Sequence, residues 1–174
     1  GLDADQGWVA LLDTRLRKQP GGWRAVNASV SGETTAGGRA RIAGELQRHR
    51  PQLVVIELGA NDGLRGLPLA HARDNLDAII RSSREAGAKV LLVGMRLPPN
   101  YGPEYTRGFE RNYVELSDVH DIALLPFLLE PIAAEREAFQ ADNLHPVAEA
   151  QPRLLEHVWS ALAPLLDSVA RSTP

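Results

Sequence analysis

The chain has 174 residues, a length that suits one domain, and 44% of them are hydrophobic, which allows a substantial buried core. The formal net charge is -3, with Lys and Arg scattered among Asp and Glu, so the sequence carries no basic patch for nucleic acid or an anionic membrane surface. The absence of cysteine excludes disulfides, thiolate metal sites and a Cys nucleophile. We therefore expect a single domain over residues 1–174 and no nucleic-acid partner.

The longest apolar run, around Leu53 to Leu58, is far shorter than the roughly 20 residues that a membrane-spanning helix needs. We therefore expect no integral membrane association. The chain opens on Gly1 and shows no basic region followed by an apolar one, so we interpret the sequence as a mature form or a fragment. The sequence indicates no oligomeric state.

The hydrophobic pattern predicts alternating helices and strands. From Trp8, the residues Leu11, Leu12 and Leu16 recur at helical spacing, and Pro20 marks the end of the helix. Further strands are expected at residues 23–30, 53–56, 90–93 and 122–125, and further helices at residues 39–49, 69–87, 105–119 and around 154–165. The continuous apolar strand at residues 53–56 suits a parallel sheet that is covered on both faces.

Strands that alternate with helices of this length predict right-handed βαβ crossovers. The expected fold is a three-layer α/β/α domain with a parallel, flavodoxin-like sheet. The series begins with a helix, whereas a crossover helix should follow a strand, so one strand is expected to precede Trp8.

In such a sheet, the chemistry gathers in loops beyond the carboxyl ends of the strands. Two of these loops contain Gly32 and Asn61, whose backbone N–H and side-chain amide can stabilise an oxyanion; one such donor contributes roughly 3–4 kcal/mol. A third loop contains Asp142 and His145, which suit an orienting acid and a general base. These residues provide most of a serine hydrolase site, but the nucleophilic serine is missing from the pattern.

The motifs around these residues are specific. Gly32 lies within Asn-Ala-Ser-Val-Ser-Gly-Glu-Thr, Asn61 within Gly-Ala-Asn-Asp-Gly, and Asp142 to His145 precede Pro146. In this order they resemble three of the four sequence blocks of the SGNH (GDSL) hydrolase family. The resemblance covers nearly the whole chain and is greatest for the bacterial multifunctional thioesterase I, protease I and lysophospholipase L1 group, also called arylesterases. It is carried by longer shared stretches at residues 57–59, 61–66, 96–98, 100–102 and 124–127.

This resemblance implies a serine esterase that acts on carboxylic esters, acyl thioesters and lysophospholipids through an acyl-enzyme, with Asp142 and His145 catalytic and Gly32 and Asn61 in the oxyanion hole. It implies a small acyl ester or thioester substrate, no cofactor and no metal, and a periplasmic or secreted location. The substrate-binding residues that it suggests are Leu64, Arg96, Leu97, Pro99 and Tyr101.

The sequence departs from the family pattern in two places. The Gly-Asp-Ser-Leu block, which in the family ends the first strand and supplies the nucleophile, is absent, and Gly1 to Asp3 match the segment shortly after it. The nucleophile is therefore expected outside this sequence. Asn143-Leu144 replaces the Gly-Ile or Gly-Val of close relatives, and we expect the turn to persist because Asn tolerates left-handed backbone conformations.

Other interpretations remain open. Asp142 could instead cap a following helix, and Arg96 or Glu57 could form a structural salt bridge. The four other histidines, His49, His71, His120 and His157, show no metal-binding spacing and are interpreted as structural or solvated.

For the whole chain, the principal alternative is a degenerate or truncated family member that binds acyl ligands without catalysis. A flavodoxin-like nucleotide or response-regulator domain would share the alternating pattern, but it lacks support from a phosphate-binding loop or an acidic cluster.

Overall fold

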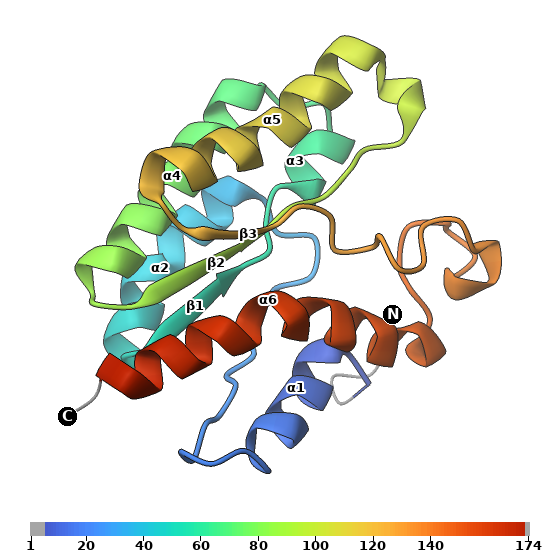
Figure 1. The fold of residues 1–174 in the computed structure, drawn as a ribbon. Coiled ribbons are helices and arrows are strands. Elements are labelled where there is room, and N and C mark those ends of the chain that lie inside the picture. Colours follow the sequence, from blue (N-terminus) through green and yellow to red (C-terminus); the bar gives the residue numbers. More distant parts are fainter. Residues whose placement is uncertain (1–5, 173–174) are drawn as a thin grey trace.

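The computed structural model describes residues 6–172 and has a three-stranded parallel sheet at its centre (Figure 1). The strands are β1 (Leu53–Ile56), β2 (Lys89–Val93) and β3 (Ala123–Leu125), in the order β1-β2-β3. Val55 lies opposite Leu91 in the first ladder. Parallel neighbours cannot be joined by a tight turn, so a helical crossover connects each pair of strands.

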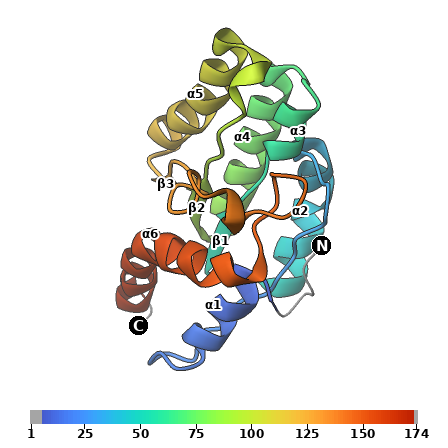
Figure 2. The ribbon, with the colours of Figure 1, turned by 90° about the vertical axis from the view of Figure 1, so that its right-hand side faces the viewer.

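Helices cover both faces of this sheet. They are α1 (Trp8–Leu16), α2 (Thr35–His49), α3 (Ala60–Leu64), α4 (Leu69–Glu85), α5 (Pro103–His120) and α6 (Gln151–Ser172), with short 3-10 turns η1 (Pro99–Tyr101), η2 (Arg136–Ala138) and η3 (Ala148–Ala150). Helices α2, α4 and α5 lie on one face, and α1 and α6 lie on the other (Figures 1 and 2). Among residues 6–172, no helix combines the length and apolar character that a membrane span requires. The expected three-layer α/β/α fold is confirmed.

The central strand β2 explains why both faces need a cover. Leu91 and Val93 point into the core beneath α1 and α6, whereas Val90 and Leu92 point into the core beneath α4 and α5. All four side chains are at most 3% exposed. Burying each such side chain contributes about 1.5–3 kcal/mol, so both helical layers are stabilised by the same strand.

The helices follow the expected pattern; α2, α5 and α6 extend beyond the expected bounds, whereas α4 ends two residues before the expected end at 87. In α4, the residues Leu76, Ile79 and Ile80 recur at spacings of three and four and are at most 2% exposed. Helix α5 begins at Pro103, where the missing N–H of proline costs nothing because the first helical N–H groups have no partner within the helix.

The prediction of a strand at residues 23–30 is wrong. This segment is extended but pairs with no strand among the described residues, and Val26 and Val30 are 58% and 55% exposed. Its backbone bonds with side chains instead: Ala25 N donates to Asp13 Oδ1 at 2.9 Å. Without a partner strand, β-prone residues cannot form a ladder. Residues 1–5, and the strand expected before Trp8, lie outside the described part of the chain.

Glu57 follows β1, and its carboxyl group has no ion pair or hydrogen bond with residues 6–172. By surface area Glu57 is exposed, but the protein atoms near its carboxyl group raise its pKa to about 7 by desolvation. The partial solvent access makes the penalty smaller than for a carboxyl group sealed in the core. The structure therefore shows no salt bridge for Glu57 within the described residues.

Tyr113 fixes the backbone that leads from β1 to α3. Its hydroxyl donates to the Leu58 carbonyl at 2.9 Å, and the side chain is 2% exposed. Gly59 has φ +111°, and a Cβ there would lie 2.4 Å from the Tyr113 hydroxyl oxygen. The backbone conformation and the contact with α5 both require glycine at this position.

We predict that Glu57→Gln stabilises the protein at high pH. The folded state favours the protonated carboxyl group, so the destabilisation appears as pH rises from the ordinary value of 4.5 to about 7 and persists above that. The free energy of unfolding should rise by about 1 kcal/mol near pH 8 and by much less near pH 4.5. Urea unfolding at both pH values measures this difference, and an equal gain at both would instead indicate a packing effect.

A second prediction concerns Tyr113→Phe, which removes a buried hydrogen bond. We expect a loss of about 1–2 kcal/mol in the free energy of unfolding. The matched control is Tyr105→Phe, since the Tyr105 hydroxyl donates to Leu67 O at 2.6 Å nearer the surface and its loss should cost less. Urea unfolding of both variants measures the difference, and equal losses would contradict the role assigned to Tyr113.

Candidate active site

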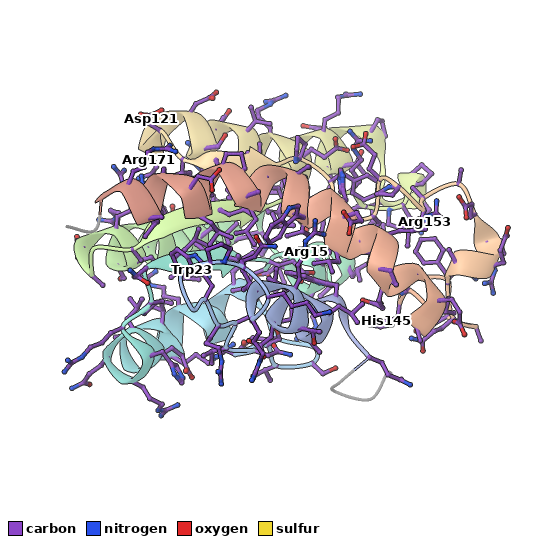
Figure 3. All side chains as sticks on the ribbon, turned by 60° about the horizontal axis from the view of Figure 1, so that its bottom comes forward. Arg15, Trp23, Asp121, His145, Arg153 and Arg171 are labelled. Atoms are coloured by element: carbon purple, nitrogen blue, oxygen red, sulfur yellow. The ribbon has the colours of Figure 1, made fainter. Side chains whose placement is uncertain are left out.

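The loops expected to carry chemistry meet at one end of the sheet. Helix α3 follows β1, the turn at residues 31–32 leads into α2, and the long loop after β3 leads toward α6. Figures 1 and 2 place these three segments at the end of the molecule toward which the strands point. In Figure 3, His145 lies at this end, whereas Asp121, which precedes β3, lies at the opposite end. The fold therefore collects the candidate residues at the carboxyl edge of the sheet.

Asp142 and His145 form a hydrogen-bonded pair within one exposed turn. Asp142 Oδ2 lies 2.6 Å from His145 Nδ1, and Asp142 Oδ1 accepts the backbone N–H groups of Leu144 and His145 at 2.9 and 3.0 Å. A carboxylate can only accept, so the proton of the imidazole lies on Nδ1 and Nε2 is left as an acceptor. This is the arrangement that a histidine general base requires.

The same contacts keep Asp142 ionised. The backbone N–H groups of His145 and Leu144, followed by the imidazole, hold the pKa of Asp142 far below its usual range. Asp142 caps no helix, since the next helical turn, η3, begins at Ala148.

Asn143, which stands where close relatives have glycine, adopts a left-handed backbone conformation. Its φ is +59°, so the predicted persistence of the turn is confirmed. The adjoining backbone also closes the loop: Gln140 N donates to His145 O at 2.8 Å, and Asn143 N donates to Gln140 O at 3.0 Å. The side chains at 143 and 144 are exposed and take no part in the Asp–His contact.

A hydrogen bond connects Asn61 to the backbone next to Gly32. Gly32 has φ +75°, and Asn61 Nδ2 donates to the carbonyl of the next residue, Glu33, at 3.0 Å. Arg65 Nη2 donates to Gly32 O at 2.9 Å. One amide hydrogen of Asn61 thus bonds to Glu33 and orients the side chain, and the other has no partner among the described residues. The pair can present two donors to a single oxyanion.

A second set of contacts, which the sequence pattern did not reveal, supports this link. Asn-Asp-Gly is a turn-forming sequence, but here it forms part of helix α3, and Asp62 within it is 4% exposed. Its carboxylate accepts both the backbone N–H and the hydroxyl of Thr35, at 2.8 and 2.6 Å. Thr35 and Asp62 lie 27 residues apart, so no local sequence signal could have found the contact.

Most of the suggested substrate-binding residues lie together, although they differ in exposure. Tyr101 donates to Leu64 O at 2.7 Å, and Leu97 packs in the same core cluster but is only 8% exposed. Pro99 is exposed in η1. Arg96 forms an ion pair with Glu110 at 3.4 Å and lies 4.9 Å from the ring centre of Phe127, which fits the structural interpretation of this residue.

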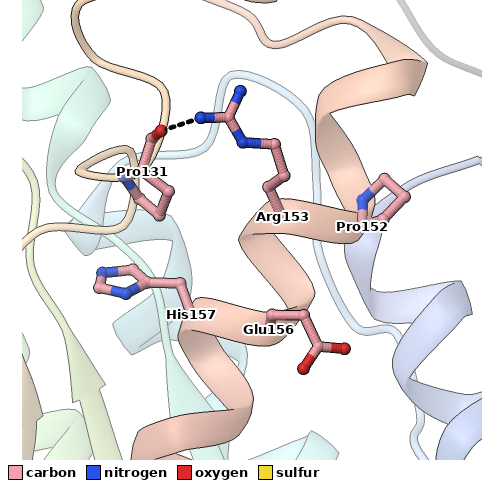
Figure 4. Close-up of a pocket in the computed structure, with 5 residues that line it drawn as sticks. All are labelled: Pro131, Pro152, Arg153, Glu156 and His157. Atoms are coloured by element: carbon pink, nitrogen blue, oxygen red, sulfur yellow. Dashed lines mark hydrogen bonds between the residues drawn. The ribbon is translucent and has the colours of Figure 1, made fainter.

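A shallow depression lies between the first turns of α6 and the loop that follows β3, and its lining contains none of the predicted site residues (Figure 4). It is lined by Pro131, Pro152, Arg153, Glu156 and His157. Its one guanidinium, that of Arg153, is already bonded to Glu135 and to the Pro131 carbonyl. Glu156 pairs with Arg15, and His157 Nε2 lies 2.9 Å from Phe127 O, so each charged or titratable side chain of the depression already has a partner. In the described part of the chain, no group of three or more His, Cys, Asp or Glu side chains is placed to hold a metal ion.

Comparison with known proteins places this geometry in a family. Residues 1–151 match the GDSL-like Lipase/Acylhydrolase family. The chain is 52% identical to Esterase TesA of Pseudomonas aeruginosa over 166 residues, which cover 95% of this chain and 83% of that protein. It is 36% identical to Thioesterase 1/protease 1/lysophospholipase L1 of Escherichia coli strain K12, with 95% of this chain and 78% of that protein covered.

Solved structures show the same similarity. The crystal structure of the psychrotrophic esterase EstA from Pseudoalteromonas sp., inhibited by monoethylphosphonate, superposes with a TM-score of 0.91 at 36% sequence identity. The match covers 96% of this chain and 91% of that one. From the family match and these similarities, the chain belongs to the GDSL-like Lipase/Acylhydrolase family.

Proposed function

We propose that the protein is a serine esterase that hydrolyses carboxylic esters, acyl thioesters and lysophospholipids through an acyl-enzyme. The observation that carries the proposal is the Asp142–His145 pair, in which His145 Nε2 has no partner among the described residues. The loop that contains this pair lies at the same sheet edge as the segments that contain Gly32 and Asn61 (Figure 1). The names of the relatives agree with this chemistry, since they include an esterase, an arylesterase and a thioesterase/lysophospholipase.

In the proposed reaction, a serine Oγ attacks the substrate carbonyl carbon while His145 Nε2 takes the hydroxyl proton. Asp142 holds the imidazole in the tautomer that accepts this proton and stabilises the imidazolium that forms. The Gly32 N–H and the free Asn61 N–H donate to the oxyanion. His145 then protonates the departing alkoxide or thiolate. In the second half of the reaction, His145 takes a proton from water, the water oxygen attacks the acyl carbon, and the serine Oγ leaves with the proton from His145.

The nucleophile is assigned to the family's Gly-Asp-Ser block, on a strand that precedes Trp8 in the full-length protein. The edge of β1 that faces away from β2 pairs with no strand among residues 6–172, which suits a further parallel strand at that edge. A serine at its carboxyl end would belong to the same edge as His145 and Asn61.

The proposal predicts that a fluorophosphonate probe labels the full-length protein once, on a serine. Phosphonylation needs the activated nucleophile, so His145→Ala should lower both labelling and ester hydrolysis by about 10³-fold or more. Intact-mass spectrometry measures the labelling, and release of p-nitrophenol from p-nitrophenyl butyrate measures the hydrolysis. The phosphonate-inhibited structure of EstA is the precedent for this class of probe.

Two matched variants separate catalysis from general damage. His49→Ala removes a histidine of α2 that pairs with Glu45 at 3.2 Å, and it should retain labelling and activity. Asn61→Ala should retain folding but lower kcat by about 10²–10³-fold, because one oxyanion donor is lost. A protein that folds, binds acyl ligands and remains unlabelled would instead be a non-catalytic member of the family.

We also propose export to the periplasm or the medium, as the family resemblance implies. Cell fractionation of the native host with an antibody against the protein measures the location. Recovery with cytoplasmic markers would contradict export without touching the proposed chemistry.

A further inference from the structure

Asp62 is placed so that it couples the two halves of the oxyanion hole. Gly32 lies in the turn before α2, and Asn61 lies in α3, so the spacing between their donors depends on how these two segments are joined. Asp62 follows Asn61 directly, and its partner Thr35 is the first residue of α2. The contact between Asp62 and Thr35 therefore joins the two segments that carry the donors.

Both oxygens of Asp62 are used in this contact. Oδ2 accepts the Thr35 N–H at 2.8 Å, and Oδ1 accepts the Thr35 hydroxyl at 2.6 Å. The Thr35 N–H is one of the first N–H groups of α2, which have no acceptor within the helix, and a carboxylate is the favoured partner there. The hydroxyl oxygen of Thr35 in turn accepts from Asn75 Nδ2 at 3.1 Å, which adds α4 to the network.

Burial makes this contact stiffer than its neighbours. Thr35 is 0% exposed and Asp62 4%, whereas the Arg65 guanidinium that bonds to Gly32 O is exposed. Water can replace a lost surface bond, but it cannot easily replace a donor or acceptor in a buried pair. Asp62 and Thr35 therefore provide the rigid part of the link, and Arg65 provides a weaker one.

We infer that Asp62 is a positioning residue for the oxyanion hole, which acts through Asn61 by fixing α3 against the Gly32 turn. This inference rests on the proposed esterase function and assigns a role that neither His145 nor Asp142 can supply. A displacement of about 1 Å at a catalytic donor lowers the rate by about 10²-fold, so a small shift of α3 is enough to be measured.

The test is a double-mutant cycle in the full-length protein with p-nitrophenyl butyrate as substrate. Asp62→Asn replaces one acceptor with an amide N–H2 that faces donors, and it should lower kcat about 10–100-fold with KM changed less than about threefold. If Asp62 acts through Asn61, the Asn61→Ala, Asp62→Asn double variant should match Asn61→Ala alone within about twofold. Effects on kcat that multiply would overturn the inference.

Conservative and matched variants guard against loss of folding. Thr35→Ser keeps both donors to Asp62 and should retain near-normal kcat, whereas Thr35→Val loses the hydroxyl and should lower it. Asp77→Asn is the matched control, because Asp77 of α4 also links two helices through its 2.7 Å contact with His120 of α5, but lies outside the oxyanion network. Asp77→Asn should reduce thermal stability, and its effect on kcat should multiply with that of Asn61→Ala.

A second readout separates this inference from the esterase proposal. The side-chain amide signals of Asn61 can be identified by their loss in Asn61→Ala, and the proton that bonds to Glu33 O should be shifted downfield and protected from exchange with water. Asp62→Asn should shift them and speed their exchange, and Asp77→Asn should not. Unchanged Asn61 signals in Asp62→Asn would overturn the inference, whether or not the protein hydrolyses esters. If the signals shift in Asp62→Asn but the wild-type protein hydrolyses no ester, only the esterase proposal is overturned.

Discussion

Two apolar layers close on β2, whose residues Val90 to Val93 are at most 3% exposed. A strand buried on both faces excludes unpaired polar side chains, because the free energy of desolvating such a group exceeds what its few contacts would contribute. Polar side chains are therefore absent from the middle of β2 and occur in the loops where the chain leaves the sheet. Because the strands are parallel, their carboxyl ends share one edge, and the loops that follow them converge there. The site depends on this packing before it depends on any individual catalytic residue.

At that edge, the protein uses two different ways to position a functional group. The Asp142–His145 turn is local: four residues contain both partners, and backbone N–H groups complete the coordination of the carboxylate. The link between Gly32 and Asn61 is long-range and depends on side chains brought together by α2 and α3. The local turn can form while solvent reaches it, whereas the long-range link is stabilised by burial.

This difference explains how far the sequence could predict the molecule. The parallel strands at residues 53–56, 90–93 and 122–125 follow from short apolar runs, and the long helices follow from periodicity, because both patterns reflect burial directly. The conformation of Asn143 was also predictable, since few residues other than Gly and Asn adopt positive φ readily. In contrast, the strand expected at residues 23–30 depended on a partner that local composition cannot supply. The Thr35–Asp62 contact was equally out of reach, because a turn-forming triplet gives no sign that its Asp will be buried against a helix 27 residues away.

The two positioning modes should also differ in how freely their residues can change. In the Asp142–His145 turn, the intervening residues contribute only backbone N–H groups and a left-handed φ, so Asn143 can replace glycine and an exposed Leu144 can follow it. In the contact between α2 and α3, Thr35 contributes a hydroxyl as well as its N–H, and Asp62 contributes two buried acceptors. An alternative residue there must reproduce both the hydrogen bonds and the shape. We therefore expect the buried contact that joins α3 to α2 to tolerate fewer substitutions than the exposed Asp142–His145 turn.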